Sequence, residues 1–161
     1  MSTHRAHVIT VSDGVAAEKR EDVSGPALVT LLQNADFEVS GPEVVPDTHD
    51  RISDAIVGAV VNGADFVVTT GGTGLGPRDV TPQATSMLID YEVPGLGELM
   101  RRAGQTSTPM ASLSRGLAGV RGHALILNVP GSMRGATESL EAVLPTLGHA
   151  MQLLHGHTKH E

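Results

Sequence analysis

The chain has 161 residues and a mass of 16.7 kDa, the size of a single domain, and its formal net charge of −7 argues against a general nucleic-acid binder, which needs a basic surface. It has no cysteine, which excludes disulfides, thiol catalysis and cysteine-based zinc sites. The sequence shows no signal-peptide core and no apolar run of membrane length, so we expect a soluble cytoplasmic domain with neither nucleic acid nor a membrane as partner.

Short β-branched or apolar runs bounded by turn residues predict four strands. They cover residues 6–12, 38–45, 66–70 and 124–129. The third run, Phe-Val-Val-Thr-Thr, is typical of a strand buried on both faces of a parallel sheet. Gly41-Pro42 interrupts the second run, which indicates an edge strand or a bend.

Apolar residues at helical spacing predict helices between and after these strands. The helices are expected to start at the cap Ser24, after Pro46-Asp47-Thr48, at the cap Thr81, at Pro94 and after Pro130-Gly131-Ser132. The third should reach about residue 90, the fourth residue 102, and the last residue 154 with a kink or break at Pro145. Residues 106–121 are expected to be loop-like, and the chain from residue 155 onward a frayed polar end.

Strands that alternate with helices predict a three-layer α/β domain, with helices on both faces of a mostly parallel sheet. We expect it to cover residues 1–156, followed by a polar tail at 157–161. Three predicted strands end in small or acidic residues: Ser12-Asp13, the loop 71–79, and residues 128–132. Because ligands of open α/β sheets bind beyond the carboxyl ends of the strands, these loops are expected to form one site.

The glycine-rich loop that starts at Gly71 is the strongest single signal. Glycines let an anion approach the backbone N–H groups, and the helix expected at Thr81 would turn its positive end toward the same space. The loop is no P-loop, since Pro77 stands where the lysine belongs, and it lacks the third glycine of a dinucleotide fingerprint. A plain strand–helix connection is the alternative.

Asp79 and Asp47 are the acidic candidates. A carboxylate beside an anion-binding loop is repulsive unless a cation lies between them, which makes Asp79 a candidate Mg²⁺ ligand. The structural alternatives are a helix N-terminal charge for Asp79 and a helix cap for Asp47. Ser132 fits both a cap and a phosphate donor. The eight histidines show no metal-ligand spacing, so we expect a solvated histidine-containing end rather than a metal set.

Taken together, the motifs resemble the MogA/MoaB family of molybdenum cofactor biosynthesis proteins, the molybdopterin adenylyltransferases. The most specific are Thr70-Gly-Gly-Thr-Gly74 followed by Arg78-Asp-Val-Thr-Pro82, joined by Val11-Ser12-Asp13, Val45-Pro46-Asp47, Leu113-Ser-Arg115 and Asn128-x-Pro-Gly-Ser132. The resemblance implies a parallel α/β fold, a homotrimer, and a pocket for the substrates molybdopterin and ATP. The implied reaction adenylylates molybdopterin and releases pyrophosphate, with hand-over of the product to a molybdenum insertase.

The resemblance also implies residue roles. Asp79 would be catalytic and Asp47 functionally important. On the charge argument given above, Asp79, together with Asp47, would hold Mg²⁺. The pocket would be lined by Ser12, Asp13, Gly71, Gly72, Thr73, Gly74, Pro130, Gly131 and Ser132, with Arg78 or Arg115 neutralising charge. Gly14 and Gln83 depart from the pattern of many relatives, and they motivate an alternative, a non-catalytic molybdopterin carrier or scaffold.

Overall fold

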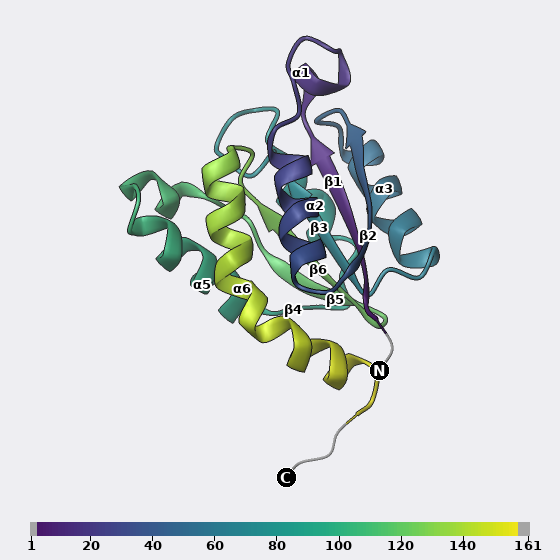
Figure 1. The fold of residues 1–161 in the computed structure, drawn as a ribbon. Coiled ribbons are helices and arrows are strands. Elements are labelled where there is room, and N and C mark those ends of the chain that lie inside the picture. Colours follow the sequence, from purple (N-terminus) through teal and green to yellow (C-terminus); the bar gives the residue numbers. More distant parts are fainter. Residues whose placement is uncertain (1–2, 158–161) are drawn as a thin grey trace.

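Six strands form one mixed sheet in the computed structural model, which describes residues 3–157 (Figure 1). The strand order is β2-β1-β3-β6-β5-β4; the first four strands are parallel, β5 pairs antiparallel with β6, and β4 pairs antiparallel with β5. Their bounds are Arg5–Val11, Glu38–Val45, Phe66–Thr70, Tyr91–Glu92, Ala118–Arg121 and Ala124–Val129 for β1 to β6. The mostly parallel α/β fold predicted from the sequence is confirmed, and β2 lies at the sheet edge.

Helices cover both faces of the sheet. The helices are α1 Asp13–Ala16, α2 Ser24–Asn34, α3 His49–Val61, α4 Thr81–Ser86, α5 Pro94–Gln105 and α6 Met133–Leu154, with a 3₁₀ turn η1 at Pro109–Leu113. Core residues of α2, α5 and α6 pack on one face, and core residues of α3 and α4 on the other. Within the described residues, no helix combines the length and apolarity needed to cross a membrane.

The continuous apolar runs of β3 and β6 serve two cores at once. Phe66 and Val68 point toward α2 and α6, whereas Val67 between them points toward α3, as the period of two in a strand requires. Leu125 and Ile126 divide between the two cores in the same way. With few aromatic residues, aliphatic side chains fill both layers and fix the position of the strand ends.

Two helix starts differ from the prediction. Ser24 and Thr81 are the first residues of α2 and α4, and Val23 and Val80 occupy the N-cap positions. The Asp22 carboxylate accepts the Gly25 N–H at 3.0 Å and so satisfies one of the free donors at the start of α2. The side chain of Thr81 is used elsewhere, in the glycine loop. Helix α4 ends at Ser86 rather than near residue 90, because the following chain leaves to pair with β5 as β4.

Three further segments differ from the sequence-based expectations. The short helix α1 was not predicted; the Ser12 hydroxyl caps it by accepting the Val15 N–H at 3.2 Å. Residues 106–121 are not a continuous loop but contain η1 and β5. In contrast, α6 agrees with the kink that was one of the two outcomes predicted for Pro145: it is one continuous helix, and Figure 1 shows it changing direction along its length. The end is not frayed at residue 155, since His155 still donates its N–H to Met151; residues 158–161 lie outside the described part.

Candidate functional site

The loops after β1, β3 and β6 meet at one edge of the sheet. Parallel pairing places Thr70 beside both Thr10 and Val129, so the three strands end level with one another. Gly71 donates its N–H to the Val129 carbonyl at 3.1 Å, and a Cβ on Gly71 would overlap the Val11 carbonyl oxygen. Gly71 has a φ of +106°, so glycine is needed there for both conformation and space.

The carbonyl groups of the glycine loop are all held from one side. Thr81 donates its hydroxyl to the Gly71 carbonyl at 2.9 Å and its N–H to the Gly72 carbonyl at 3.1 Å. Arg115 donates its backbone N–H to the Thr73 carbonyl and its Nε to the Gly74 carbonyl, both at 2.9 Å. Four consecutive carbonyls are therefore fixed by two residues, one from α4 and one from the segment after η1.

This arrangement orients the opposite side of the loop. In a trans peptide unit the C=O and the following N–H point in opposite directions. With the carbonyls turned toward Thr81 and Arg115, the N–H groups of Gly72, Thr73 and Gly74 are turned away, and they find no protein acceptor within residues 3–157. Successive free N–H groups of this kind form a concave anion-binding site. At the start of α4, the Thr81 N–H is not free for a ligand, because it is already bonded to the Gly72 carbonyl.

A cavity of about 480 Å³ opens in front of this loop. Its size is within the range of small-molecule sites. Gly72, Thr73, Gly74 and Asp79 line one side together with Pro130, Gly131 and Ser132. The remaining wall comes from α5, η1 and α6 and includes Met100, Arg101, Ser107, Met110, Leu113, Ser114, Arg134, Glu138 and Ser139. The sequence-predicted loops thus form only the smaller part of the cavity wall.

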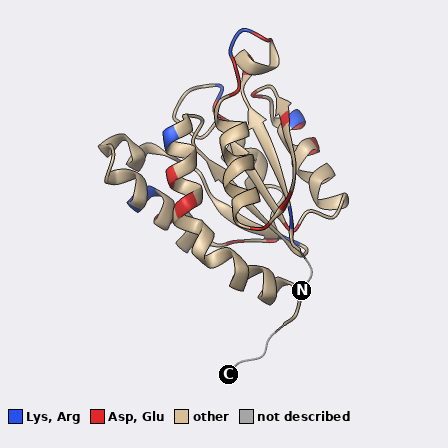
Figure 2. Cartoon of the chain, in the orientation of Figure 1, with Lys and Arg blue, Asp and Glu red and all other residues tan. Residues whose placement is uncertain are grey.

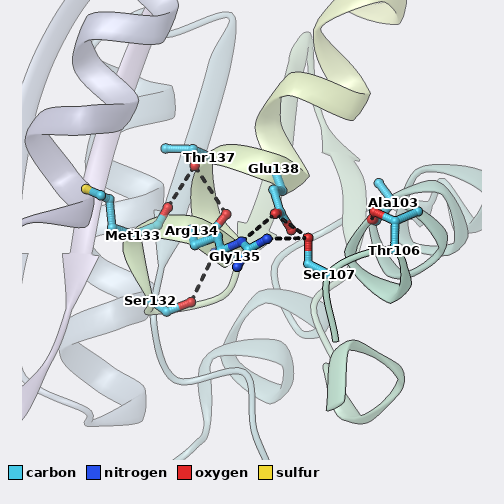
Figure 3. Close-up of polar contacts among 9 residues, drawn as sticks. All are labelled: Ala103, Thr106, Ser107, Ser132, Met133, Arg134, Gly135, Thr137 and Glu138. Carbon is cyan, nitrogen blue, oxygen red and sulfur yellow. Dashed lines mark hydrogen bonds and ion pairs between the residues drawn. The ribbon is translucent and has the colours of Figure 1, made fainter. Parts of the chain in front are cut away.

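A polar cluster formed by α6 and the segment after α5 contributes to the cavity wall (Figure 3). Arg134 donates its Nε to Glu138 at 2.9 Å, and Ser107 donates its hydroxyl to the same Oε1. These two hydrogen bonds hold the pKa of Glu138 below its usual value, and the one from Ser107 has the larger effect. Ser132 caps α6 by accepting the Gly135 N–H at 3.1 Å, as its position after β6 predicts.

Asp13 and Asp47 lock two loops to each other. Asp13 donates its N–H to the Asp47 carboxylate at 2.8 Å, and Asp47 donates its N–H to the Asp13 carboxylate at 3.0 Å. Arg78 donates its Nε and Nη2 to the two oxygens of Asp13, each at 3.0 Å. In the cartoon of Figure 2, segments coloured for acidic and for basic residues lie close together around α1. Asp47 therefore does not cap α3 through its carboxylate, as the alternative interpretation held; Thr48 is the N-cap residue.

The two carboxyl groups titrate in opposite directions. The hydrogen bonds from Arg78 lower the pKa of Asp13, an exposed group. Burial raises the pKa of Asp47, and the negative charges of Asp13 and Asp79 add to that effect. Asp47 is thus a partly buried carboxylate beside two others, with Arg78 as the only cation that acts on it among the described residues.

The residues at this edge fit a divalent cation. Asp79 accepts the Gly76 N–H at 2.9 Å through one oxygen, and a Cβ on Gly72 would lie 3.1 Å from Asp47 Oδ1, so both carboxylates lie against the glycine loop. Within the described residues, Asp13, Asp47 and Asp79 do not form a closed three-ligand cluster. This suits Mg²⁺, which usually takes one or two carboxylates and completes its shell with water and phosphate oxygens.

Several predicted site residues adjoin the glycine loop but do not line the cavity. Ser12, Asp13, Asp47 and Arg78 form the adjoining loop contacts and do not line the cavity. Arg115 also adjoins the loop: besides Gly74, it donates Nη2 to the Asp79 carbonyl at 2.7 Å and Nη1 to Gln83 Oε1 at 3.1 Å. Its contacts are those of a residue that positions the loop.

Sequence reasoning missed the wall formed by α5, η1 and α6. Ser107, Arg134 and Glu138 are separated by up to 31 positions and follow no known motif. The one available signal was the Arg134-to-Glu138 spacing of four, which predicts a surface ion pair on a helix rather than a cavity wall.

The fold and the site define an α/β domain with a cavity at the carboxyl ends of its parallel strands, lined in part by the glycine loop. Residues 7–149 match the family model described as a probable molybdopterin binding domain. The chain belongs to this family, within which its motifs place it in the MogA/MoaB group.

Individual relatives agree over nearly the whole chain. The chain is 38% identical to the molybdopterin adenylyltransferase of Helicobacter pylori (strain J99), covering 97% of this chain and 90% of that protein. It is 52% identical to the molybdopterin biosynthesis enzyme MoaB from Thermus thermophilus, with a TM-score of 0.90 over 96% of this chain and 98% of the other. It is also 40% identical to a molybdenum cofactor biosynthesis bifunctional protein from Synechococcus elongatus, covering 94% of this chain but 47% of that relative. The chain thus spans about half the length of such bifunctional relatives.

Proposed function

We propose that this protein acts in molybdenum cofactor biosynthesis as a nucleotidyltransferase that transfers AMP from ATP to the terminal phosphate of molybdopterin. The observation that carries the proposal is the glycine loop itself. Thr81 and Arg115 hold its carbonyls, so that its free N–H groups are turned away from them, beside the carboxylate of Asp79 at one end of the cavity. This arrangement suits phosphate oxygens accompanied by a cation.

The chemistry asks little of the protein beyond positioning and charge neutralisation. An oxygen of the molybdopterin phosphate attacks the α-phosphorus of ATP, a phosphoanhydride bond forms, and the bond to the β-phosphate oxygen breaks to release pyrophosphate. A phosphate monoester has a second pKa near 6 and is mostly ionised at pH 7, so no general base is needed. The donors of the loop would orient the reacting phosphates, and their electrostatic effect is largest where charge develops.

Asp79 and Asp47 would hold Mg²⁺, which supplies charge neutralisation for the phosphate oxygens when bound. Asp79 is fixed by the Gly76 N–H and lies between Gly74 and Gly76, where a Cβ on either glycine would come within 2.9 Å of Oδ2. Asp47 is fixed through Asp13. Both carboxylates are therefore oriented in advance, without a substrate present.

The direct test measures pyrophosphate release from ATP, Mg²⁺ and molybdopterin. Asp79→Asn keeps the size of the side chain and is expected to lower kcat by about 100-fold or more, because one charge that holds the cation is removed. Binding of molybdopterin, measured by calorimetry, should change little.

Asp50→Asn is the matched control, because Asp50 is almost fully exposed in the first turn of α3. Its turnover should equal that of the wild type. A wild-type protein that releases no pyrophosphate with any divalent metal would overturn the proposal, and tight molybdopterin binding without ATP binding would support the carrier alternative instead. That alternative rested partly on Gln83, which in the structure accepts a hydrogen bond from Arg115 and so takes part in holding the loop.

The homotrimer implied by the family motifs is part of the same proposal. Exposed apolar side chains such as Leu75, Met110 and Met133 lie near the rim of the site and are compatible with contacts between subunits. Light scattering on the purified protein should give three times the 16.7 kDa chain mass. Hand-over of the product to a molybdenum insertase is expected on the same basis.

A further inference from the structure

A second cluster of ligand-type side chains lies at the opposite edge of the sheet, where the parallel strands begin. It consists of His4 before β1, Asp65 before β3 and His155 at the end of α6. The distance is 2.8 Å between His155 Nε2 and Asp65 Oδ1 and 3.7 Å between His4 Nδ1 and Asp65 Oδ2. One ligand atom from each residue lies within 4.8 Å of the other two.

The backbone around this cluster is fixed on all sides. Asp65 donates its N–H to the Arg5 carbonyl, and its own carbonyl accepts the Leu125 N–H, so it is fastened between β1 and β6. The Arg5 N–H in turn donates to Asp65 Oδ2 at 2.8 Å, which orients the carboxylate. The His4 carbonyl accepts the Glu38 N–H at 3.0 Å. Such supporting contacts are typical of preformed metal sites.

Among the described residues, the negative charge of Asp65 has no ion-pair partner that is always positively charged. The Asp65 side chain is 17% exposed, and its ion-pair partners among the described residues are His4 and His155, which carry charge only when protonated. Three imidazole rings are stacked here: His155 lies between His4 and His123, with ring centroids 5.8 and 5.9 Å away. A partly buried carboxylate surrounded by imidazoles is stabilised by a cation that binds to nitrogen and oxygen together.

From these observations we propose that His4, Asp65 and His155 bind a divalent transition metal ion of the zinc class. Two imidazoles and one carboxylate are a ligand set that suits Zn²⁺, with water in the remaining positions. With bonds of about 2.1 Å, two ligand atoms on a tetrahedral ion lie about 3.4 Å apart. The contacts of 2.8 Å to Asp65 Oδ1 and 3.7 Å to Asp65 Oδ2 involve different oxygens, and ligand atoms of the three residues lie within 4.8 Å of one another, so side-chain rotations have to bring one oxygen and the two nitrogens to this separation around a single ion.

The site would link the segment before β1, the residue before β3 and the end of α6 to one another. It is independent of the nucleotidyltransferase proposal, because it lies at the other edge of the sheet and uses nitrogen ligands that Mg²⁺ disfavours. An ion that binds the folded state alone raises the stability of that state with its concentration. The expected role of the metal is therefore structural.

The experiment titrates Zn²⁺ into the full-length, tag-free and metal-stripped chain by calorimetry, with millimolar Mg²⁺ present to occupy the carboxylate site. One Zn²⁺ per chain should bind, and the thermal unfolding midpoint should rise. Co²⁺ should give the visible absorption of a site with low coordination number. His155→Ala and His4→Ala should each weaken Zn²⁺ binding at least tenfold.

His149→Ala and a His157→Ala, His160→Ala double variant are the matched controls; His149 and His157 are exposed, and His160 lies outside the described residues. They should bind Zn²⁺ like the wild type. If Asp65→Ala fails to fold, Asp65→Asn keeps the acceptor for Arg5 and should still weaken binding. No binding by the wild type, or binding that survives loss of His4 and His155 but is lost in the controls, would overturn the proposal.

Discussion

The candidate sites at the two ends of the parallel strands are built from different groups: mainly backbone of contiguous loops at one end, and side chains from distant positions at the other. At the carboxyl edge, backbone N–H groups and carboxylates come mainly from short contiguous motifs such as residues 71–74. At the amino edge, side chains of His4, Asp65 and His155 come from the start, the middle and the end of the chain. The first site depends on backbone conformation, which glycine spacing reveals, and the second on side chains that meet only after folding.

This difference has a consequence for substitutions. At the carboxyl edge, a change that disturbs loop geometry should abolish function even when no ligand-contacting atom is lost. At the amino edge, only the three ligand side chains and their supports should matter. The two sites share the sheet but no residue, so damage to one should leave the other intact as long as the fold persists.

Gly71→Ala is expected to have the largest effect. The added Cβ would overlap the Val11 carbonyl oxygen, and alanine is strained at a φ of +106°. The combined cost is about 2–5 kcal/mol of unfolding free energy, measurable by urea denaturation. Gly58→Ala is the control, because a Cβ there meets no atom within 4 Å on α3; it should be stabilising by about 0.5–1 kcal/mol. Equal stability of the two variants would contradict the backbone argument.

Arg115→Lys tests whether the charge or the geometry of Arg115 matters. It keeps the positive charge but loses the planar set of donors that binds the carbonyls of Gly74 and Asp79. If Arg115 positions the loop, we expect kcat/KM for pyrophosphate release to fall about 10- to 100-fold, with Arg115→Gln equally impaired. Zn²⁺ binding at the other edge should stay unchanged. A lysine variant close to wild-type activity would show instead that charge alone is needed, as in direct phosphate binding.

Asp47→Asn should have the smallest effect on the free energy of unfolding, and the effect should be stabilising near pH 7. The pKa of Asp47 is raised in the folded state, chiefly by burial, so its ionisation costs folding free energy once the pH exceeds its unfolded pKa, and the full cost applies above its folded pKa. The asparagine variant should therefore unfold at higher urea concentration than the wild type near pH 7, and this difference should vanish at acidic pH. Activity should fall nonetheless. A variant less stable than the wild type at neutral pH would mean that the contact with Asp13 outweighs burial.

The α/β class, the two central strands and the glycine loop after β3 could be predicted from the amino-acid sequence. These features are local: an apolar run of five or six residues and a glycine pattern limit the backbone whatever lies around them. The same holds for Ser132 as the cap of α6. Local signals were weaker at helix starts, where Asp22 rather than Ser24 binds the free N–H of Gly25.

The contacts between residues far apart in the sequence could be found from the folded structure alone. Arg115 supports a loop 41 positions earlier, Asp13 and Asp47 bind each other across 34 positions, and His155 reaches Asp65 across 90. No spacing rule contains such pairs, because they form when sheet and helices pack and bring the chain segments together. The residue types in the sequence indicate which ligands the protein could bind. The packing of the whole domain sets where each site lies and which residues form it.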